Sequence, residues 1–166
     1  MKKLFLLFVI ILSINTFSQD ARSIINEGNK LSNNENFKDA IIKYTEAISI
    51  DKKESDAYLQ RAYAYIRLKD YNNAIKDYSE VIRINPNNSF AYLSRGSAYN
   101  NIKQYNKALS DFNKVLLINP DDQEAYNNRG WAKKGLGDKK GACKDWKISR
   151  KLGNREAKII YKNNGC

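Results

Sequence analysis

Small and aromatic residues recur along this chain with a period of 34 residues. Four 34-residue repeats follow one another without insertion or deletion, starting at Ala21, Ser55, Ser89 and Gln123. Position 8 of each repeat is Gly28, Ala62, Gly96 and Gly130, and position 24 is Tyr44, Tyr78, Phe112 and Trp146. Self-similarity at a fixed period of this length is typical of architectures in which each repeat is one supersecondary element.

Within each repeat, the apolar positions predict two helices. Positions 4, 8 and 11 share one face of a helix, and positions 17, 20, 21, 24, 27 and 28 form the apolar face of a second. Small residues at positions 8 and 20 let the two helices approach closely, while aromatic residues fill the space between them. Pro86 and Pro120 stand where the second helix must end, and Gly153 takes that place in the last repeat.

This pattern of aromatic-x-x-x-Gly, Ala-x-x-x-aromatic and Pro resembles the tetratricopeptide repeat. The repeats are expected at residues 21–54, 55–88, 89–122 and 123–154, followed by a capping helix at 155–162. The resemblance implies an all-α solenoid of four helix-turn-helix repeats in a right-handed superhelix. The last repeat departs from the pattern with Lys133, Lys139 and Ser149 at apolar positions. Atypical end repeats are expected, because each has one face without a neighbour.

Residues 1–18 have the pattern of a secretory signal peptide. Two lysines precede the apolar run Leu4–Leu12, which is shorter than the roughly 20 residues of a membrane span. Small residues stand at the −3 and −1 positions of a cut after Ser18. We therefore expect a repeat domain at 19–166, secreted through the Sec pathway to the periplasm or cell envelope; an uncleaved N-terminal helix is the alternative.

The absence of histidine from the sequence narrows the possible chemistry. It excludes a Ser-His-Asp triad, a Cys-His dyad and any imidazole metal ligand. Two cysteines are too few for a four-thiolate zinc site, and no imidazole can activate either as a nucleophile. We therefore expect a protein that is not an enzyme and that needs no cofactor or metal.

The net charge of +11 is concentrated near the end of the chain. Residues 19–128 contain 15 basic and 15 acidic side chains, whereas residues 129–166 contain 12 basic and 3 acidic ones. The cluster includes Lys133, Lys134, Lys139, Lys140, Lys144, Lys147, Arg150, Lys151, Arg155, Lys158 and Lys162. Such a run is usually a solvated surface. The alternative is binding of an anionic polymer or membrane surface; secretion would remove most nucleic acid from reach.

Positions 7 and 23 carry opposite charges in every repeat, and both signs invert together in the first. The pairs are Glu27 with Lys43, Arg61 with Asp77, Arg95 with Asp111, and Arg129 with Asp145. In a hairpin that turns at positions 15–16, position 7 lies opposite position 24 and therefore next to position 23. The pattern predicts an ion pair within each repeat, worth about 0.3–1 kcal/mol if partly exposed. The alternative is that these charges flank the core by chance.

Positions 2, 5, 6, 9, 12 and 13 of each first helix lie away from the hairpin core. In tetratricopeptide repeat proteins this stripe lines a concave binding surface, so the resemblance implies a protein or peptide partner there. The candidate groove residues are Asn29, Asn33, Leu59, Tyr63, Ile66, Arg67, Ser97, Asn100, Asn101, Asn127, Trp131 and Lys134. Amide and hydroxyl groups can bind a peptide backbone, and Tyr63 and Trp131 are candidate anchors. Alternatively, Trp131 covers a neighbouring helix.

Some members of the family hold an acidic chaperone tail with five side chains from three successive repeats. These are Lys at position 5 and Asn at position 9 of one repeat, Asn at position 6 of the next, and Lys at position 2 with Arg at position 6 of the third. Counted from the first repeat, the corresponding residues here are Ile25, Asn29, Gln60, Phe90 and Ser94. Counted from the second repeat, they are Leu59, Tyr63, Ser94, Glu124 and Asn128. Both sets lack the cations, so acidic-tail recognition is not expected. The expected function is a non-catalytic interaction scaffold of the bacterial cell envelope that binds a peptide or protein segment.

Cys143 and Cys166 are positioned to form a disulfide. Cys143 lies on the core side of the last repeat's second helix, and the capping helix runs back antiparallel after a turn at residues 153–154. Reflection about that turn puts residue 143 opposite roughly residue 164, two residues before Cys166. This geometry allows the separation of about 4.4–6.8 Å that bridged Cα atoms require. Export would supply an oxidising compartment. The alternative is a small buried Cys143 and a frayed chain end.

Overall fold

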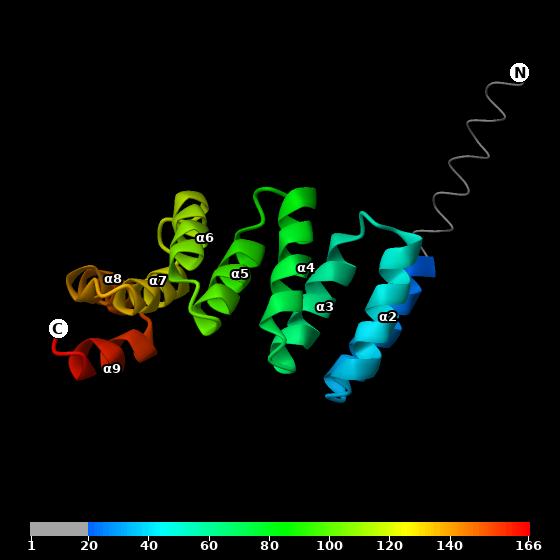
Figure 1. The fold of residues 1–166 in the computed structure, drawn as a ribbon, viewed down its shortest axis with the longest axis horizontal. Coiled ribbons are helices and arrows are strands. Elements are labelled where there is room, and N and C mark those ends of the chain that lie inside the picture. Colours follow the sequence, from blue (N-terminus) through cyan, green and yellow to red (C-terminus); the bar gives the residue numbers. More distant parts are fainter. Residues whose placement is uncertain (1–19) are drawn as a thin grey trace, which may run out of the picture. The chain divides into compact units, whose positions relative to one another are not determined.

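A computed structural model describes residues 20–166, and all regular secondary structure in that range is helical (Figure 1). Residues 20–33 are helical, and the following helices are α2 (Phe37–Ile50), α3 (Ser55–Arg67), α4 (Tyr71–Ile84), α5 (Ser89–Asn101), α6 (Tyr105–Ile118), α7 (Gln123–Gly135), α8 (Lys139–Lys151) and α9 (Arg155–Asn163). The predicted signal peptide lies outside the described residues. Within the described range, no helix is long and apolar enough to cross a membrane.

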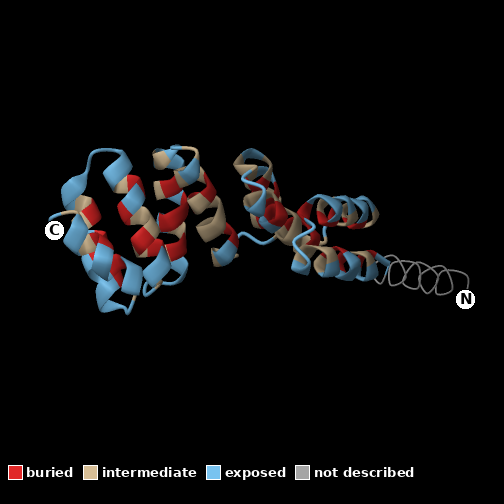
Figure 2. Cartoon of the chain, turned by 90° about the horizontal axis from the view of Figure 1, so that it is seen from below, coloured by how far each residue is buried: buried red, intermediate tan, exposed pale blue. Residues whose placement is uncertain are grey.

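The chain divides into two compact units, an N-terminal unit up to Ile84 and a C-terminal unit from Asn85 to Cys166. In the N-terminal unit, α3 packs on α2 and on α4. In the C-terminal unit, α5 packs on α6, α7 on α8, and α9 on α8. Figure 2 shows buried residues along one side of the helices and exposed residues along the other. Each unit is therefore a stack of helix-turn-helix pairs, as the period of 34 residues predicts.

In three of the four helix pairs a large ring packs directly against a glycine, and in the other pair Ala62 takes the glycine's position. Phe112 is fully buried against Gly96, where an added Cβ atom would lie 2.7 Å from the phenylalanine ring. Trp146 fills the same space against Gly130, and a Cβ atom there would overlap the indole. Because real Cβ contacts are longer than this, position 8 must be small wherever position 24 carries such a ring.

The turn inside each pair has the same backbone conformation. Glu35, Lys69 and Lys103 all stand at position 15 and have φ values of 59°, 60° and 61°. The fourth equivalent residue is Gly137, with φ of 87°. The chain thus reverses at position 15 in the left-handed region of backbone conformation. This conformation has a higher free energy for lysine or glutamate than for glycine.

Two of the three polar residues that break the pattern in the last repeat have partners within that repeat. Lys133 forms an ion pair with Asp145 across a distance of 2.7 Å. Ser149 is fully buried, and its hydroxyl donates to the carbonyl of Gln123 at 2.6 Å. Lys139 is exposed at the first residue of α8. Lys133 and Ser149 are therefore paired inside this repeat, whereas Lys139 faces solvent.

Candidate functional site

The C-terminal unit contains a cavity of about 670 Å³ whose walls come from four helices. Helices α5 and α7 supply most of the lining, and α6 and α9 supply one residue each. The lining residues are Ser97, Asn100, Asn101, Tyr105, Asn128, Trp131, Lys134, Gly135 and Glu156. The polar part of this wall is made of three amides and two hydroxyls, with one cation and one carboxylate.

Hydrogen bonds between α5 and α7 hold the amide side chains in place. Asn100 Nδ2 donates to the carbonyl of Asn128 at 2.9 Å, and Asn128 Nδ2 donates to Ser97 Oγ at 3.2 Å. Asn101 Nδ2 donates to the carbonyl of Ser97 at 2.9 Å. Asn100 Oδ1 is buried and has no hydrogen-bond partner among the residues that the structure describes. The wall is thus preoriented and retains an unused acceptor.

Trp131 forms the aromatic part of the wall. Its ring is 36% exposed and packs edge-on against the buried ring of Trp146, with 5.3 Å between centroids. Lys134 lies over the Trp131 ring at 5.0 Å and donates to Asn164 Oδ1 at 2.6 Å. The ring of Tyr105 occupies the space into which a side chain at residue 135 would project, so this arrangement of the ring requires Gly135. The exposed indole is therefore supported from behind and available to a ligand.

Asn127 is not part of this cavity, although the sequence placed it in the groove. The residue is buried, and its Nδ2 donates to Glu156 Oε2 at 3.3 Å. Its carbonyl accepts from Trp146 Nε1 at 3.1 Å. Position 5 faces the next helix of the stack: its counterpart Ile25 is buried in the core of the N-terminal unit. The correction is that Asn128, one residue later, faces the cavity.

The candidates from the N-terminal unit lie outside this cavity, and several contact other residues of their own unit. Asn29 Oδ1 accepts from the Tyr44 hydroxyl at 2.8 Å. Tyr63 packs edge-on against Phe37, and its hydroxyl accepts from Arg67 Nη1 at 2.9 Å. Asn33 is exposed, and Leu59 and Ile66 are half-buried. Of the twelve sequence candidates, the cavity gathers Ser97, Asn100, Asn101, Trp131 and Lys134. It also includes Tyr105, Asn128, Gly135 and Glu156, which were not among them.

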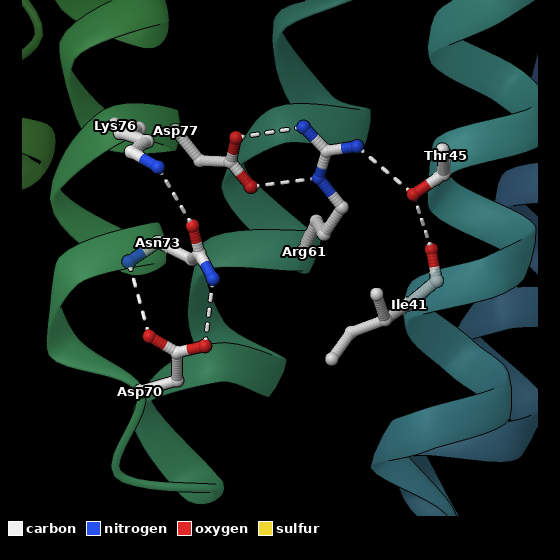
Figure 3. Close-up of polar contacts among 7 residues, drawn as sticks. All are labelled: Ile41, Thr45, Arg61, Asp70, Asn73, Lys76 and Asp77. Carbon is white, nitrogen blue, oxygen red and sulfur yellow. Dashed lines mark hydrogen bonds and ion pairs between the residues drawn. The ribbon is translucent and has the colours of Figure 1, made fainter.

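Each position-7 residue is paired with position 23 of its own repeat. Arg61 donates from Nε and Nη2 to the two carboxylate oxygens of Asp77, both at 2.8 Å (Figure 3). The Arg95–Asp111 and Arg129–Asp145 pairs have the same two-bond geometry at 2.8–2.9 Å. Lys43 Nζ lies 2.8 Å from Glu27 Oε2.

The burial of these pairs differs from the sequence expectation. The three aspartates are buried, whereas the sequence predicted partly exposed pairs; only the Glu27–Lys43 pair has that character. Hydrogen bonds to the aspartates raise the pKa of Arg61, Arg95 and Arg129, which keeps the guanidinium groups charged. Charges at these positions therefore belong to the interior of the helix pairs.

Comparison with known proteins identifies the family. The model described as "Tetratricopeptide repeat" matches residues 55–88 and 89–122. The chain is a tetratricopeptide repeat protein. A stretch of 47 residues, 28% of this chain, is 40% identical to human sperm-associated antigen 1 (Homo sapiens) and spans 5% of that protein's length.

Solved structures share the tetratricopeptide fold. MamA 41-end from Desulfovibrio magneticus RS-1 has a TM-score of 0.79 at 21% identity, over 87% of this chain and 89% of that one. The first such domain of Spaghetti (RPAP3), bound to the HSP90 peptide SRMEEVD, has a TM-score of 0.69 at 29% identity, over 72% and 95%. The second domain of human RPAP3, in complex with the HSP70 peptide SGPTIEEVD, has 0.66 at 30%, over 69% and 96%.

The position-7 arginine also links neighbouring tetratricopeptide repeats, a role that sequence reasoning missed. Arg61 Nη1 donates to Thr45 Oγ1 of the preceding repeat at 2.9 Å. Figure 3 shows Arg61 between Asp77 and Thr45. Arg129 Nη1 makes the equivalent bond to Asn113 Oδ1 at 2.8 Å. Both acceptors stand at position 25, so a polar residue there was the available signal.

A disulfide joins Cys143 of α8 to Cys166, which follows α9, with 5.5 Å between the Cα atoms. Cys166 packs against a cluster that contains Ala142, Trp146 and Ile160. The bond and this cluster hold α9 on α8. Because α9 carries Glu156, the disulfide also supports one wall of the cavity.

Proposed function

We propose that this protein is a non-catalytic interaction scaffold that binds an extended peptide segment of a partner protein in the cavity of the C-terminal unit. The preoriented amide wall of α5 and α7 carries the proposal. A peptide main chain presents one N–H donor and one C=O acceptor at most residues. The amides of Asn101 and Asn128, which line the cavity, complement those groups without selecting a particular sequence.

The aromatic wall supplies the anchor for one partner side chain. Tryptophan is enriched among the interface residues that contribute most to binding. Trp131 is supported by Trp146 and remains partly exposed in the cavity. An apolar or aromatic partner side chain would gain contact area there without rearrangement of the wall.

The charges in the cavity support a partner different from an acidic tail. Lys134 and Glu156 are the two charged residues of the lining, and Lys134 is already bonded to Asn164. The RPAP3 domains hold peptides that end in Glu-Glu-Val-Asp. Since this sequence lacks the family's cations at the positions that hold such tails, we propose a neutral or mixed-charge segment.

We further propose that the scaffold acts in the bacterial cell envelope, as a repeat domain at 19–166 after removal of a signal peptide at 1–18. Two observations support this location. The N-terminal sequence has the pattern of a secretory signal. The Cys143–Cys166 disulfide is of a kind that persists in oxidising compartments.

Selection from a random peptide library tests the binding site. The purified protein should enrich peptides whose synthetic versions change the tryptophan fluorescence on binding. Trp131→Ala should weaken that binding at least about tenfold, as loss of a central anchor does. Tyr63→Ala is the matched control, since Tyr63 is also an exposed aromatic but lies outside the cavity. Peptides that bind both variants as well as the parent, or a selection without enrichment, would contradict the proposal.

A further inference from the structure

The last two helices carry cations without counter-charges. Their exposed basic residues are Lys139, Lys140, Lys144, Lys147, Arg150, Lys151, Arg155, Lys158 and Lys162. None of these forms an ion pair within the part of the chain that the structure describes. The nearby carboxylates are otherwise engaged: Asp145 is paired, Asp138 caps α8, and Glu156 accepts from Asn127.

These cations form a basic stripe on the exposed side of each helix. On α8, Lys140, Lys144, Lys147 and Lys151 share a side by their spacing, away from the buried side that contains Trp146. On α9, Arg155, Lys158 and Lys162 share a side opposite the buried residues Ala157 and Ile160.

A stacked pair joins the two helices. The Arg150 guanidinium of α8 lies 4.6 Å from the centroid of the Tyr161 ring of α9. A hollow of about 370 Å³ lies at this junction, lined by Arg150, Lys158, Tyr161, Lys162, Gly165 and Cys166. Three cations therefore converge on a space large enough for a phosphate group, and the adjacent disulfide fixes the end of the chain there.

An apolar side chain projects from the same face. Ile159 is 62% exposed on α9 and by helical spacing stands beside Arg155 and Lys162. Exposed Ile148 lies on α8 next to Lys144 and Lys151 in the helical arrangement. A polyanion would use the cations and leave both isoleucines in water. The boundary between lipid headgroups and acyl chains accommodates both kinds of side chain.

We propose that the outer face of α8 and α9 docks this protein on a membrane surface that contains anionic phospholipids. The hollow at Arg150, Lys158 and Lys162 holds a lipid phosphate, and Ile159 enters the interface. Glu156, which lines the peptide cavity, lies on a different side of α9 from Lys158 by helical spacing. Contacts of Lys158 with lipid headgroups would thus leave Glu156 uncovered.

Vesicle flotation tests the docking surface. The protein should float with phosphatidylcholine vesicles that contain phosphatidylglycerol, remain unbound with phosphatidylcholine alone, and dissociate as salt is added. A Lys158→Glu, Lys162→Glu double variant should bind the anionic vesicles at least about tenfold more weakly. Lys52→Glu, Lys53→Glu is the matched control, because these exposed lysines lie in the N-terminal unit and the change in net charge is the same. Circular dichroism verifies that both variants are folded.

A second variant separates lipid from polyanion. Ile159→Ser should reduce vesicle binding several-fold and leave binding of inorganic polyphosphate unchanged, because polyphosphate offers no apolar phase. Three results would overturn the proposal: no flotation with anionic vesicles, equal losses in the two charge-reversal variants, or full vesicle binding by Ile159→Ser. Peptide binding measured through Trp131 should remain unchanged in Lys158→Glu, Lys162→Glu, so failure of docking and failure of the peptide site are distinguishable.

Discussion

Asp145→Asn should destabilise the C-terminal unit strongly. The Asp145 side chain is 3% exposed, and its carboxylate faces three charged donor groups: Nε and Nη2 of Arg129, each at 2.8 Å, and Nζ of Lys133 at 2.7 Å. Asparagine keeps the shape but presents an NH₂ group where an acceptor is needed, and it leaves two cations without a counter-charge. Removal of one partner from a buried ion pair costs about 3–5 kcal/mol.

The equivalent pair in the first repeat provides the control. Glu27 and Lys43 are also 2.8 Å apart, but their side chains are 53% and 34% exposed, so water replaces the lost interaction. Glu27→Gln should therefore destabilise the protein several-fold less than Asp145→Asn. Urea unfolding followed by circular dichroism measures both, and tryptophan fluorescence reports the last repeat. A loss below about 1 kcal/mol for Asp145→Asn would refute the reasoning, since exposed pairs reach that value.

Three further predictions concern charge, redox state and specificity. The hydrogen bond from Lys43 lowers the pKa of Glu27, so Lys43→Gln should raise the Glu27 pKa in an NMR titration, and an unchanged pKa would contradict the pairing. The stability that the pair adds should disappear as pH falls through the folded-state pKa of Glu27. Denatured, unreduced protein should contain no free thiols, and two titratable thiols would disprove the bond. Cys143→Ser should lower the free energy of unfolding by about 3 kcal/mol according to the chain-entropy model. The peptide SRMEEVD should not bind in calorimetry, and saturable heat release would show that other cations replace the missing ones.

The helix pairs were predictable because their contacts are encoded at fixed spacing. A glycine at position 8 and a ring at position 24 predict the close approach that Gly96 and Phe112 make. The joint inversion of sign at Glu27 and Lys43 predicts pairing within a repeat, and the structure has that pair. The burial of the aspartates was not predictable, since it depends on how deeply the second helix sits against its neighbours.

The cavity was only partly predictable because neighbouring helices decide which residues face it. Asn127 and Asn128 are adjacent and chemically identical, yet one is buried against Glu156 and the other lines the cavity. Helical periodicity separates them by about 100°. It does not determine which of them meets the next helix of the stack. Tyr105 and Glu156 come from two further helices, so their place in the wall follows only from tertiary packing.

The side-chain NMR signals of the cavity test peptide binding most directly. When a library-selected peptide is added to saturation, the Nδ2 resonances of Asn100, Asn101 and Asn128 and the indole resonance of Trp131 should shift. The amide of Asn29, which lies in the N-terminal unit and outside the cavity, should keep its position. Shifts at Asn29 with unchanged cavity resonances would contradict a binding site formed by α5 and α7.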